Sequence, residues 1–210
     1  MMKHFYKNEN ELQVGLDESG RGCLLGPVCI GAVILNDITE NPPPYPIKDS
    51  KKCSSKIRKI LREYIENNSI AYHVQFISES EIDKHNILKA TMNGMHLCLN
   101  EITKQLSIDR ILVDGNYFIP YTDNVTSEII PNICIPNGDN KYMNIAAASI
   151  LAKEYRDEYI IKLCKDNKIL YNYDILNNKG YGTKYHMESL KDLGPTKWHR
   201  KTFKPKYLKE

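Results

Sequence analysis

The sequence contains no apolar run long enough to cross a membrane, and its first residues include no apolar core of the signal-peptide kind. Its six cysteines are scattered, with no Cys-x-x-Cys pair and no spacing typical of a disulfide framework. No group of His and Cys residues has zinc-ligand spacing, and there is neither an internal repeat nor a low-complexity tract. These absences exclude membrane-spanning, disulfide-stapled, zinc-finger and repeat proteins. They lead us to expect a cytoplasmic chain with reduced thiols.

Neither sign of charge is in large excess, because the formal net charge is +3, but the charges are unevenly placed. Residues 48–62 hold seven Lys or Arg and one acid, and residues 195–210 hold six and one, so the rest of the chain is acidic overall. This segregation suits a polyanionic partner. A solvated helix face and a solvated tail would give the same pattern, so charge alone does not decide.

Strand and helix patterns alternate along the chain, which predicts an α/β domain with a mixed sheet flanked by helices. The expected strands are 12–18, 28–35, 71–77, 110–114 and 131–135. The expected helices are a basic one capped by Ser54 or Ser55, one broken or two consecutive helices over 79–106, a long one over 141–165, and one near 185–193.

Four carboxylates stand where expected strands end or just before the long helix. Asp17 and Glu18 close the first strand, Asp114 closes the fourth, and Asp139 precedes the helix. Ligand sites of α/β sheets gather beyond strand ends, and carboxylates brought together there need a cation to offset their repulsion. Oxygen ligands of this kind suit Mg²⁺ or Mn²⁺. Two such ions roughly 3.5–4 Å apart can hold a phosphodiester for in-line attack.

Each acid also has an ordinary structural explanation. Asp139 fits the N-cap of the long helix, Asp114 fits a turn former, and Asp17 with Glu18 fits the exposed end of a strand. Neighbours in a regular strand point to opposite faces, so Asp17 and Glu18 reach one site only if the pleat breaks, as the glycines that follow would allow. The residues alone therefore indicate a candidate Mg²⁺-dependent phosphotransfer site.

Residues 15–22, Gly-Leu-Asp-Glu-Ser-Gly-Arg-Gly, resemble the D-E-A-G-R-G signature of type 2 ribonucleases H. Ser19 replaces the usual alanine, and Cys23-Leu24-Leu25 stands where many members have Pro-Leu-Ala. Type 3 enzymes have threonine at the position of Arg21 and a long N-terminal extension, so Arg21 favours type 2. Further matching segments follow in order along nearly the whole chain: Asp49-Ser-Lys-Lys52, 86–95, 112–116, Gly138-Asp139, 145–153, Arg156-Asp157, 180–184, His186, 194–196 and His199-Arg200.

The resemblance implies an RNase H-like fold, with residues 1–165 as the catalytic domain. Residues 166–210 would form a small helical C-terminal region that closes over the substrate within the same compact unit. The acids implied to bind two Mg²⁺ or Mn²⁺ ions are Asp17, Glu18, Asp114 and Asp139. The residues implied to contact the ribonucleotide at an RNA–DNA junction through their backbone are Gly20, Arg21 and Gly22. Tyr181 would sense the 2′-hydroxyl, which distinguishes RNA from DNA; without the resemblance it would be an ordinary loop tyrosine.

The implied activity is hydrolysis of the RNA strand of RNA/DNA hybrids and cutting 5′ of single ribonucleotides in duplex DNA, leaving 3′-hydroxyl and 5′-phosphate ends. Lys48, Lys51 and Lys52 are expected to touch phosphate. We expect a self-sufficient monomer without a membrane partner, and the sequence leaves open a clamp protein that binds the tail. The aromatic residues expected to dock the tail are Trp198, Phe203 and Tyr207.

Two other functions remain at this point. One is a resolvase-like nuclease that cuts DNA, against which the Gly-Arg-Gly segment and Tyr181 argue because a DNA nuclease needs no 2′-hydroxyl sensor. The other is a subunit that binds hybrids without cutting them, against which the full set of acids argues.

Overall fold

Five strands form one mixed sheet in the order β3-β2-β1-β4-β5. The computed structural model describes residues 2–203, so the expectations for Tyr207 and the tail lysines 204–209 fall outside the described residues. The strands are β1 (Gln13–Ser19), β2 (Val28–Leu35), β3 (Ser69–Ile77), β4 (Arg110–Asp114) and β5 (Asn132–Ile135). β2 pairs antiparallel with both β1 and β3, whereas β4 pairs parallel with both β1 and β5. The predicted mixed sheet is confirmed.

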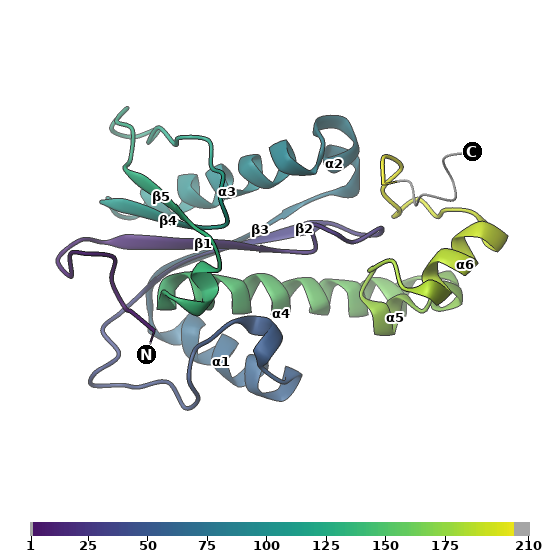
Figure 1. The fold of residues 1–210 in the computed structure, drawn as a ribbon, viewed down its shortest axis with the longest axis horizontal. Helices are drawn as coiled ribbons and strands as arrows, with labels where there is room; N and C mark the ends of the chain where they lie inside the picture. Colours follow the sequence, from purple (N-terminus) through teal and green to yellow (C-terminus); the bar gives the residue numbers. More distant parts are fainter. Residues whose placement is uncertain (1, 204–210) are drawn as a thin grey trace.

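Helices cover both faces of the sheet (Figure 1). On one face lie α2 (Glu79–His85) and α3 (Ile87–Thr103), so residues 79–106 hold two consecutive helices. On the other face lie α4 (Met143–Asp166) and α1 (Ser55–Asn68), and the Ser54 side chain accepts the capping hydrogen bond of α1. The short helices are η1 (Ser50–Lys52), η2 (Gly138–Asn140), η3 (Lys168–Tyr173), α5 (Ile175–Asn178) and α6 (Lys184–Leu193).

The long helix α4 lies unusually close to the sheet because two strand residues opposite it are glycines. A Cβ atom built on Gly15 would lie 2.2 Å from the backbone of Asn144, and one on Gly31 would lie 2.3 Å from the carbonyl oxygen of Ala148. The run Ala146–Ala147–Ala148 is fully buried at this interface. These small residues let the backbone of α4 pack directly against the sheet.

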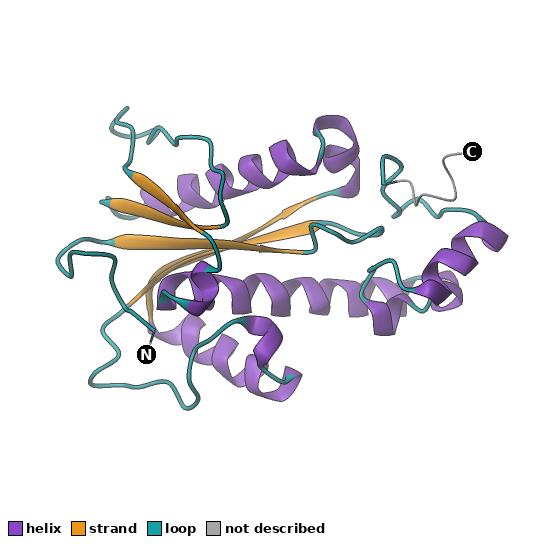
Figure 2. Cartoon of the chain, viewed as in Figure 1, coloured by secondary structure: helices purple, strands orange, loops and turns teal. Residues whose placement is uncertain are grey.

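Residues 168–198 of the C-terminal region pack around the last turns of α4, at one end of the molecule (Figure 2). Leu25, from the loop between β1 and β2, lies in the same cluster, with Trp198 packed against it. Phe203 instead packs against the main core between the sheet and α3. The predicted docking of the chain after residue 195 is therefore confirmed for Trp198 and Phe203.

No helix in residues 2–203 combines the length and the apolar character that a membrane span requires. All six cysteines are unpaired, and five of them are buried, including Cys23 and Cys29.

Candidate active site

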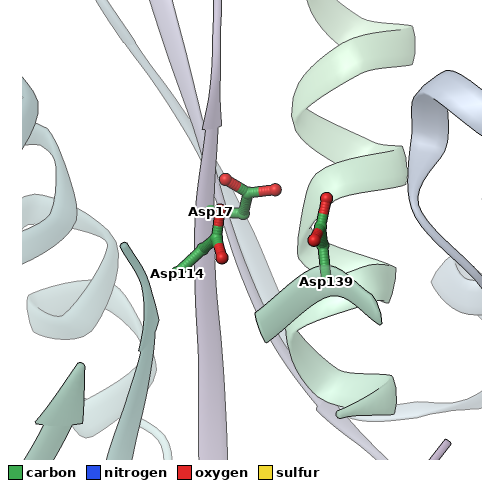
Figure 3. Close-up of side chains that lie close together, drawn as sticks. All are labelled: Asp17, Asp114 and Asp139. Carbon is green, nitrogen blue, oxygen red and sulfur yellow. The ribbon is translucent and has the colours of Figure 1, made fainter. Parts of the chain in front are cut away.

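Three of the four predicted acids converge at one end of the sheet. Asp17, Asp114 and Asp139 each direct a carboxylate oxygen to within 4.8 Å of the other two (Figure 3). Asp17 lies in β1 and Asp114 ends β4, and because these strands run parallel their carboxyl ends meet at the same edge. Asp17 and Asp139 are each only 5% exposed.

Asp139 reaches the cluster from η2 and does not cap the long helix. The N-cap of α4 is Tyr142, so the explanation of Asp139 as a helix cap is wrong. The loop that carries it turns at Asn137, which has a φ of 53°. The backbone N–H of Gly138 then donates to Oδ1 of Asp114 at 2.7 Å, and this bond links the two acid-bearing segments. A side chain at Gly138 would meet Ile145, because its Cβ atom would lie 2.6 Å from that residue's Cδ1.

Asp17 is held by a backbone group and a hydroxyl. Its Oδ1 accepts a hydrogen bond from the N–H of Glu18 at 2.7 Å, and Ser149 of α4 also bonds to the carboxylate. The Ser149 hydroxyl lies 3.0 Å from that of Ser50 in η1. Neither serine was assigned a role from the sequence, although both stand inside matched motif segments. The sequence feature that could have drawn attention to them is a lone hydroxyl, at Ser50 beside basic residues and at Ser149 within an apolar run.

Glu18 lies beside this cluster and outside the group of three. The expected break in the pleat does not occur, because β1 remains paired with β2 through Ser19. The Glu18 carboxylate accepts a hydrogen bond from Arg21 at 3.2 Å, and its charge still acts on Asp17.

The site is electrostatically unfavourable without a cation. Burial, followed by the charges of Glu18 and Asp114, raises the pKa of Asp17 well above its ordinary value. Burial also raises the pKa of Glu18, and burial with the charge of Asp114 raises that of Asp139. The convergent carboxylate oxygens of Asp17, Asp114 and Asp139 are a donor set that suits Mg²⁺ or Mn²⁺.

Basic residues of the first positive segment lie at the border of the acids. The charge of Lys51 in η1 acts on both Glu18 and Asp139 and favours their ionised forms. The ammonium group of Lys52 donates to the side chain of Asn140, which is the last residue of η2.

The Gly-Arg-Gly turn (residues 20–22) directly follows β1 and contacts the segment that contains Tyr181. The N–H of Leu24 donates to the carbonyl of Gly180 at 2.7 Å. Gly180 has a φ of 87°, and a Cβ atom there would lie 2.6 Å from the carbonyl oxygen of Leu25. Tyr181 is 41% exposed, and its hydroxyl bonds to the side chain of Cys23, the residue directly after the turn.

Comparisons with known proteins agree on one family. Residues 14–209 match the sequence profile described as Ribonuclease HII. A curated Ribonuclease HII from Parabacteroides distasonis is 43% identical over 198 residues, which cover 94% of this chain and 92% of that protein. Two solved structures share the fold. The ribonuclease H2 of Pyrococcus horikoshii has a TM-score of 0.71 at 24% identity, covering 91% of this chain and 93% of that one.

The second solved structure is the PCNA:RNase HII complex of Archaeoglobus fulgidus, with a TM-score of 0.70 and 26% identity. The match covers 92% of this chain and 96% of that chain. The profile and the curated relative each extend over most of the sequence, and the matched range contains all of the predicted site residues. The chain belongs to the ribonuclease HII family.

Proposed function

We propose that this chain hydrolyses the RNA strand of RNA/DNA hybrids and cuts 5′ of single ribonucleotides in duplex DNA, with two divalent cations bound at the acids. Membership of the family makes it a metal-dependent type 2 ribonuclease H, an endoribonuclease acting on RNA/DNA hybrids. One observation supports the finer proposal most. The carboxylates of Asp17, Asp114 and Asp139 converge, and they come from β1, β4 and η2. The first of these elements, β1, leads directly into the Gly-Arg-Gly turn.

The proposed ligands are the convergent acids Asp17, Asp114 and Asp139, with Glu18 as a fourth at the border of the group, where its charge acts on Asp17 and that of Asp114 acts on it. Two bound divalent ions would supply an activated water and stabilisation of the leaving oxygen, the chemistry expected of an in-line displacement that leaves a 3′-hydroxyl and a 5′-phosphate. The protein's own part is to fix the ligands. The N–H of Gly138 orients Asp114, and the N–H of Glu18 with the Ser149 hydroxyl orients Asp17.

The residues proposed to select the substrate lie beside the acids. Gly20, Arg21 and Gly22 would contact the ribonucleotide through backbone groups, which glycines leave accessible. Tyr181 would contact the 2′-hydroxyl. Lys51 and Lys52 would contact backbone phosphates and so position the duplex without reading its sequence.

The first test is cleavage of a DNA duplex with one embedded ribonucleotide, in Mg²⁺, in Mn²⁺ and in EDTA. We expect metal-dependent cutting on the 5′ side of that ribonucleotide. Cutting of long hybrids alone would contradict the junction specificity. Cutting of an all-DNA junction alone would support a resolvase-like nuclease, and binding without any cutting would support a non-catalytic subunit.

Tyr181→Ala tests the proposed 2′-hydroxyl contact. We expect it to reduce cleavage of the single-ribonucleotide duplex by about tenfold or more relative to its effect on a long hybrid, because a hybrid offers many alternative 2′-hydroxyls. Tyr185→Ala, at an exposed tyrosine in α6, is the matched control. Equal losses on both substrates would show that Tyr181 does not sense the junction.

The proposal extends to the chain's setting. We propose that it acts as a monomer in the cytoplasm, where its unpaired cysteines would stay reduced. A sliding clamp is a proposed partner, since the related Archaeoglobus fulgidus enzyme is found in a complex with PCNA. Sedimentation of the chain with and without a clamp protein tests both statements.

A further inference from the structure

His199 and Arg200 are adjacent residues buried directly behind the two proposed recognition segments. They are only 3% and 2% exposed. His199 forms an antiparallel bridge with Leu25. On either side of that bridge, the N–H of Gly26 donates to the carbonyl of Trp198, and the N–H of Arg200 donates to the carbonyl of Leu24, both at 2.9 Å. The segment that contains His199 and Arg200 is thus fastened to the chain just after the Gly-Arg-Gly turn.

Within residues 2–203 the guanidinium of Arg200 donates only to backbone carbonyls. It reaches the carbonyl oxygens of Gly20 and Arg21 at 2.8 Å each, and that of Gly26 at 2.9 Å. Among the described residues no carboxylate forms an ion pair with it. Burial lowers the pKa of Arg200 to about 10. The charges of Glu79 and Asp83 favour its ionised form, and the ring of Phe203 lies 4.9 Å from its central carbon. A buried charge also needs hydrogen-bond partners, which the three carbonyl oxygens supply.

Holding those carbonyls inward fixes the direction of two N–H groups. In a trans peptide the C=O and the N–H that follows it point in opposite directions, and this chain has no cis peptide in its described part. With the oxygens of Gly20 and Arg21 held by Arg200, the N–H groups of Arg21 and Gly22 must point away from it. Within residues 2–203 neither N–H has a hydrogen-bond acceptor, and the space beside Gly22 is open.

His199 reaches Tyr181 through a second histidine. Nδ1 of His186 lies 2.9 Å from the carbonyl oxygen of Tyr181, which can only accept, so Nδ1 has the proton. Nε2 of His186 must then accept from Nε2–H of His199, 3.0 Å away. This leaves Nδ1 of His199 to accept from the N–H of Thr196 at 2.9 Å. With one tautomer assigned to each neutral ring, all three hydrogen bonds between Tyr181 and Thr196 are satisfied.

We propose that Arg200 and His199 are positioning residues for ribonucleotide recognition. Arg200 orients the N–H groups of the Gly-Arg-Gly turn toward the substrate, and His199, through His186, holds the backbone at Tyr181. This inference rests on the proposed function, because only there do the turn and Tyr181 contact the ribonucleotide. Arg156 has a different task. It donates to the carbonyls of Leu25, Pro27 and Lys179 and so joins the two segments to α4 without bonding to the carbonyls of the turn.

The test of Arg200 is the variant Arg200→Lys, which keeps the charge and loses the planar fork of donors. Three substrates separate recognition from chemistry: a single-ribonucleotide duplex, a long hybrid, and an all-DNA duplex for binding alone. We expect the ratio of kcat/KM for the single ribonucleotide to that for the hybrid to fall by about tenfold or more, as expected when a positioning contact is lost. Affinity for the all-DNA duplex should not change.

A matched control is Arg110→Lys. Arg110 also makes two hydrogen bonds through its guanidinium, but to Glu11, at the opposite end of β1 and β4 from the acids. This variant should retain the wild-type ratio. Equal losses of Arg200→Lys on all three substrates, together with a lower melting temperature, would overturn the proposal by showing a purely structural role.

A second pair of variants tests the contact of His199 with Tyr181 through His186. It does not depend on whether Arg200→Lys folds. His199→Gln keeps an N–H donor near the position of Nε2, whereas His199→Leu removes it. We expect His199→Leu to lower the same ratio and His199→Gln to restore most of it. Equal ratios in the two variants would overturn the assignment of His199.

The wild-type protein separates this inference from the proposed function. If it cuts neither the single-ribonucleotide duplex nor the hybrid, the proposed function fails and the positioning roles fail with it. If it cuts both and Arg200→Lys keeps the same ratio, only the positioning role is overturned.

Discussion

Asp17 is the residue at which burial and negative charge combine most strongly. It is 5% exposed, and its charged neighbours include two further carboxylates. Among the described residues, its hydrogen bonds come from the N–H of Glu18 and the hydroxyl of Ser149. The metal-free protein therefore holds this side chain in an unfavourable state, which a divalent cation would relieve. Without metal, a neutral side chain at position 17 would make the protein more stable. With metal, activity requires the charged carboxylate as a ligand.

Asp17→Asn should separate these two demands. We expect it to remove nearly all cleavage while leaving hybrid binding mostly intact, because the duplex is held by other groups. In EDTA the variant should melt about 2–4 °C above the wild type, the shift expected for a gain of roughly 1 kcal/mol in a chain of this size. Cleavage assays and thermal melts measure the two effects. Near wild-type cleavage would rule out Asp17 as a metal ligand.

The stability gain of Asp17→Asn should depend on pH. The pKa of Asp17 is raised in the folded protein, so between about pH 4 and that raised value the folded state binds more protons than the unfolded state. The wild-type free energy of unfolding therefore falls as the pH rises through this window, and the Asp17→Asn variant lacks this loss. Urea unfolding in EDTA should give a larger difference between the proteins at about pH 8 than at about pH 5. A constant difference would contradict the raised pKa.

The convergence of Asp17, Asp114 and Asp139 could be predicted from the sequence, because the first two stand at strand ends and the third follows a glycine just before the long helix. Glu18, predicted with them, lies outside this group, and its role as a ligand stays a prediction. Ser149 could not be predicted, because nothing in a run of small residues shows that its hydroxyl faces Asp17. Arg200 and His199 were seen only as matched motif positions. Their roles depend on carbonyl groups and a ring that lie far away along the chain, and a local pattern has no access to such contacts.

At the scale of elements, the site depends on how closely α4 approaches the sheet. Gly31 permits a backbone contact with Ala148, and the next residue along α4 is Ser149, which bonds to Asp17. A methyl group at position 31 has no flexible neighbour that could move aside, because the obstructing atoms belong to the helix backbone. The spacing of helix and sheet thus sets the position of a hydroxyl in the site.

Gly31→Ala should therefore harm both stability and catalysis. We expect a loss of about 1–3 kcal/mol in the free energy of unfolding, the usual cost of overpacking a core, measured by urea titration. Activity should fall further than stability explains, since Ser149 is displaced from Asp17. Gly22→Ala is the control for stability, because a Cβ atom there meets nothing within 4 Å. An unchanged stability of Gly31→Ala would contradict the close approach.

The positions of the helices and strands could be predicted where the apolar pattern and the caps are clear. They were harder to predict where contacts with distant parts of the chain determine the local backbone. All five strands and the long helix lie close to their predicted positions. The break in the pleat that the glycines after Glu18 would allow does not occur, because pairing with β2 keeps β1 regular through Ser19. The explanation of Asp139 as the N-cap of α4 was also wrong, because Asp139 lies in η2, three residues before the N-cap at Tyr142.

At the scale of the whole molecule, an acidic body has a basic segment beside its acid cluster. Residues 48–62 hold seven basic side chains, and Lys51 and Lys52 lie next to η2. A polyanionic duplex would therefore be attracted to the border of the site and repelled by most of the remaining surface.

Hybrid binding should consequently weaken steeply with salt, and these lysines should contribute to the slope. We expect Lys51→Ala and Lys52→Ala each to reduce the slope of log K against log salt concentration by about 0.7–0.9, the value of one phosphate contact. Anisotropy titrations in the Asp17→Asn background avoid cleavage. Lys104→Ala, at the C-terminal end of α3 and paired with Glu101, should leave the slope unchanged. An unchanged slope in all three variants would place the phosphates elsewhere.

The bond between Arg200 and Gly20 joins positions 180 residues apart. A ribosome makes the turn long before it makes the arginine that shapes it, whereas the three convergent acids are all present once residue 139 has been added. During synthesis the groups for cutting are thus complete ahead of the groups for choosing what to cut. We expect a growing chain to become selective only after the segment around Arg200 has been made and has bonded to the turn.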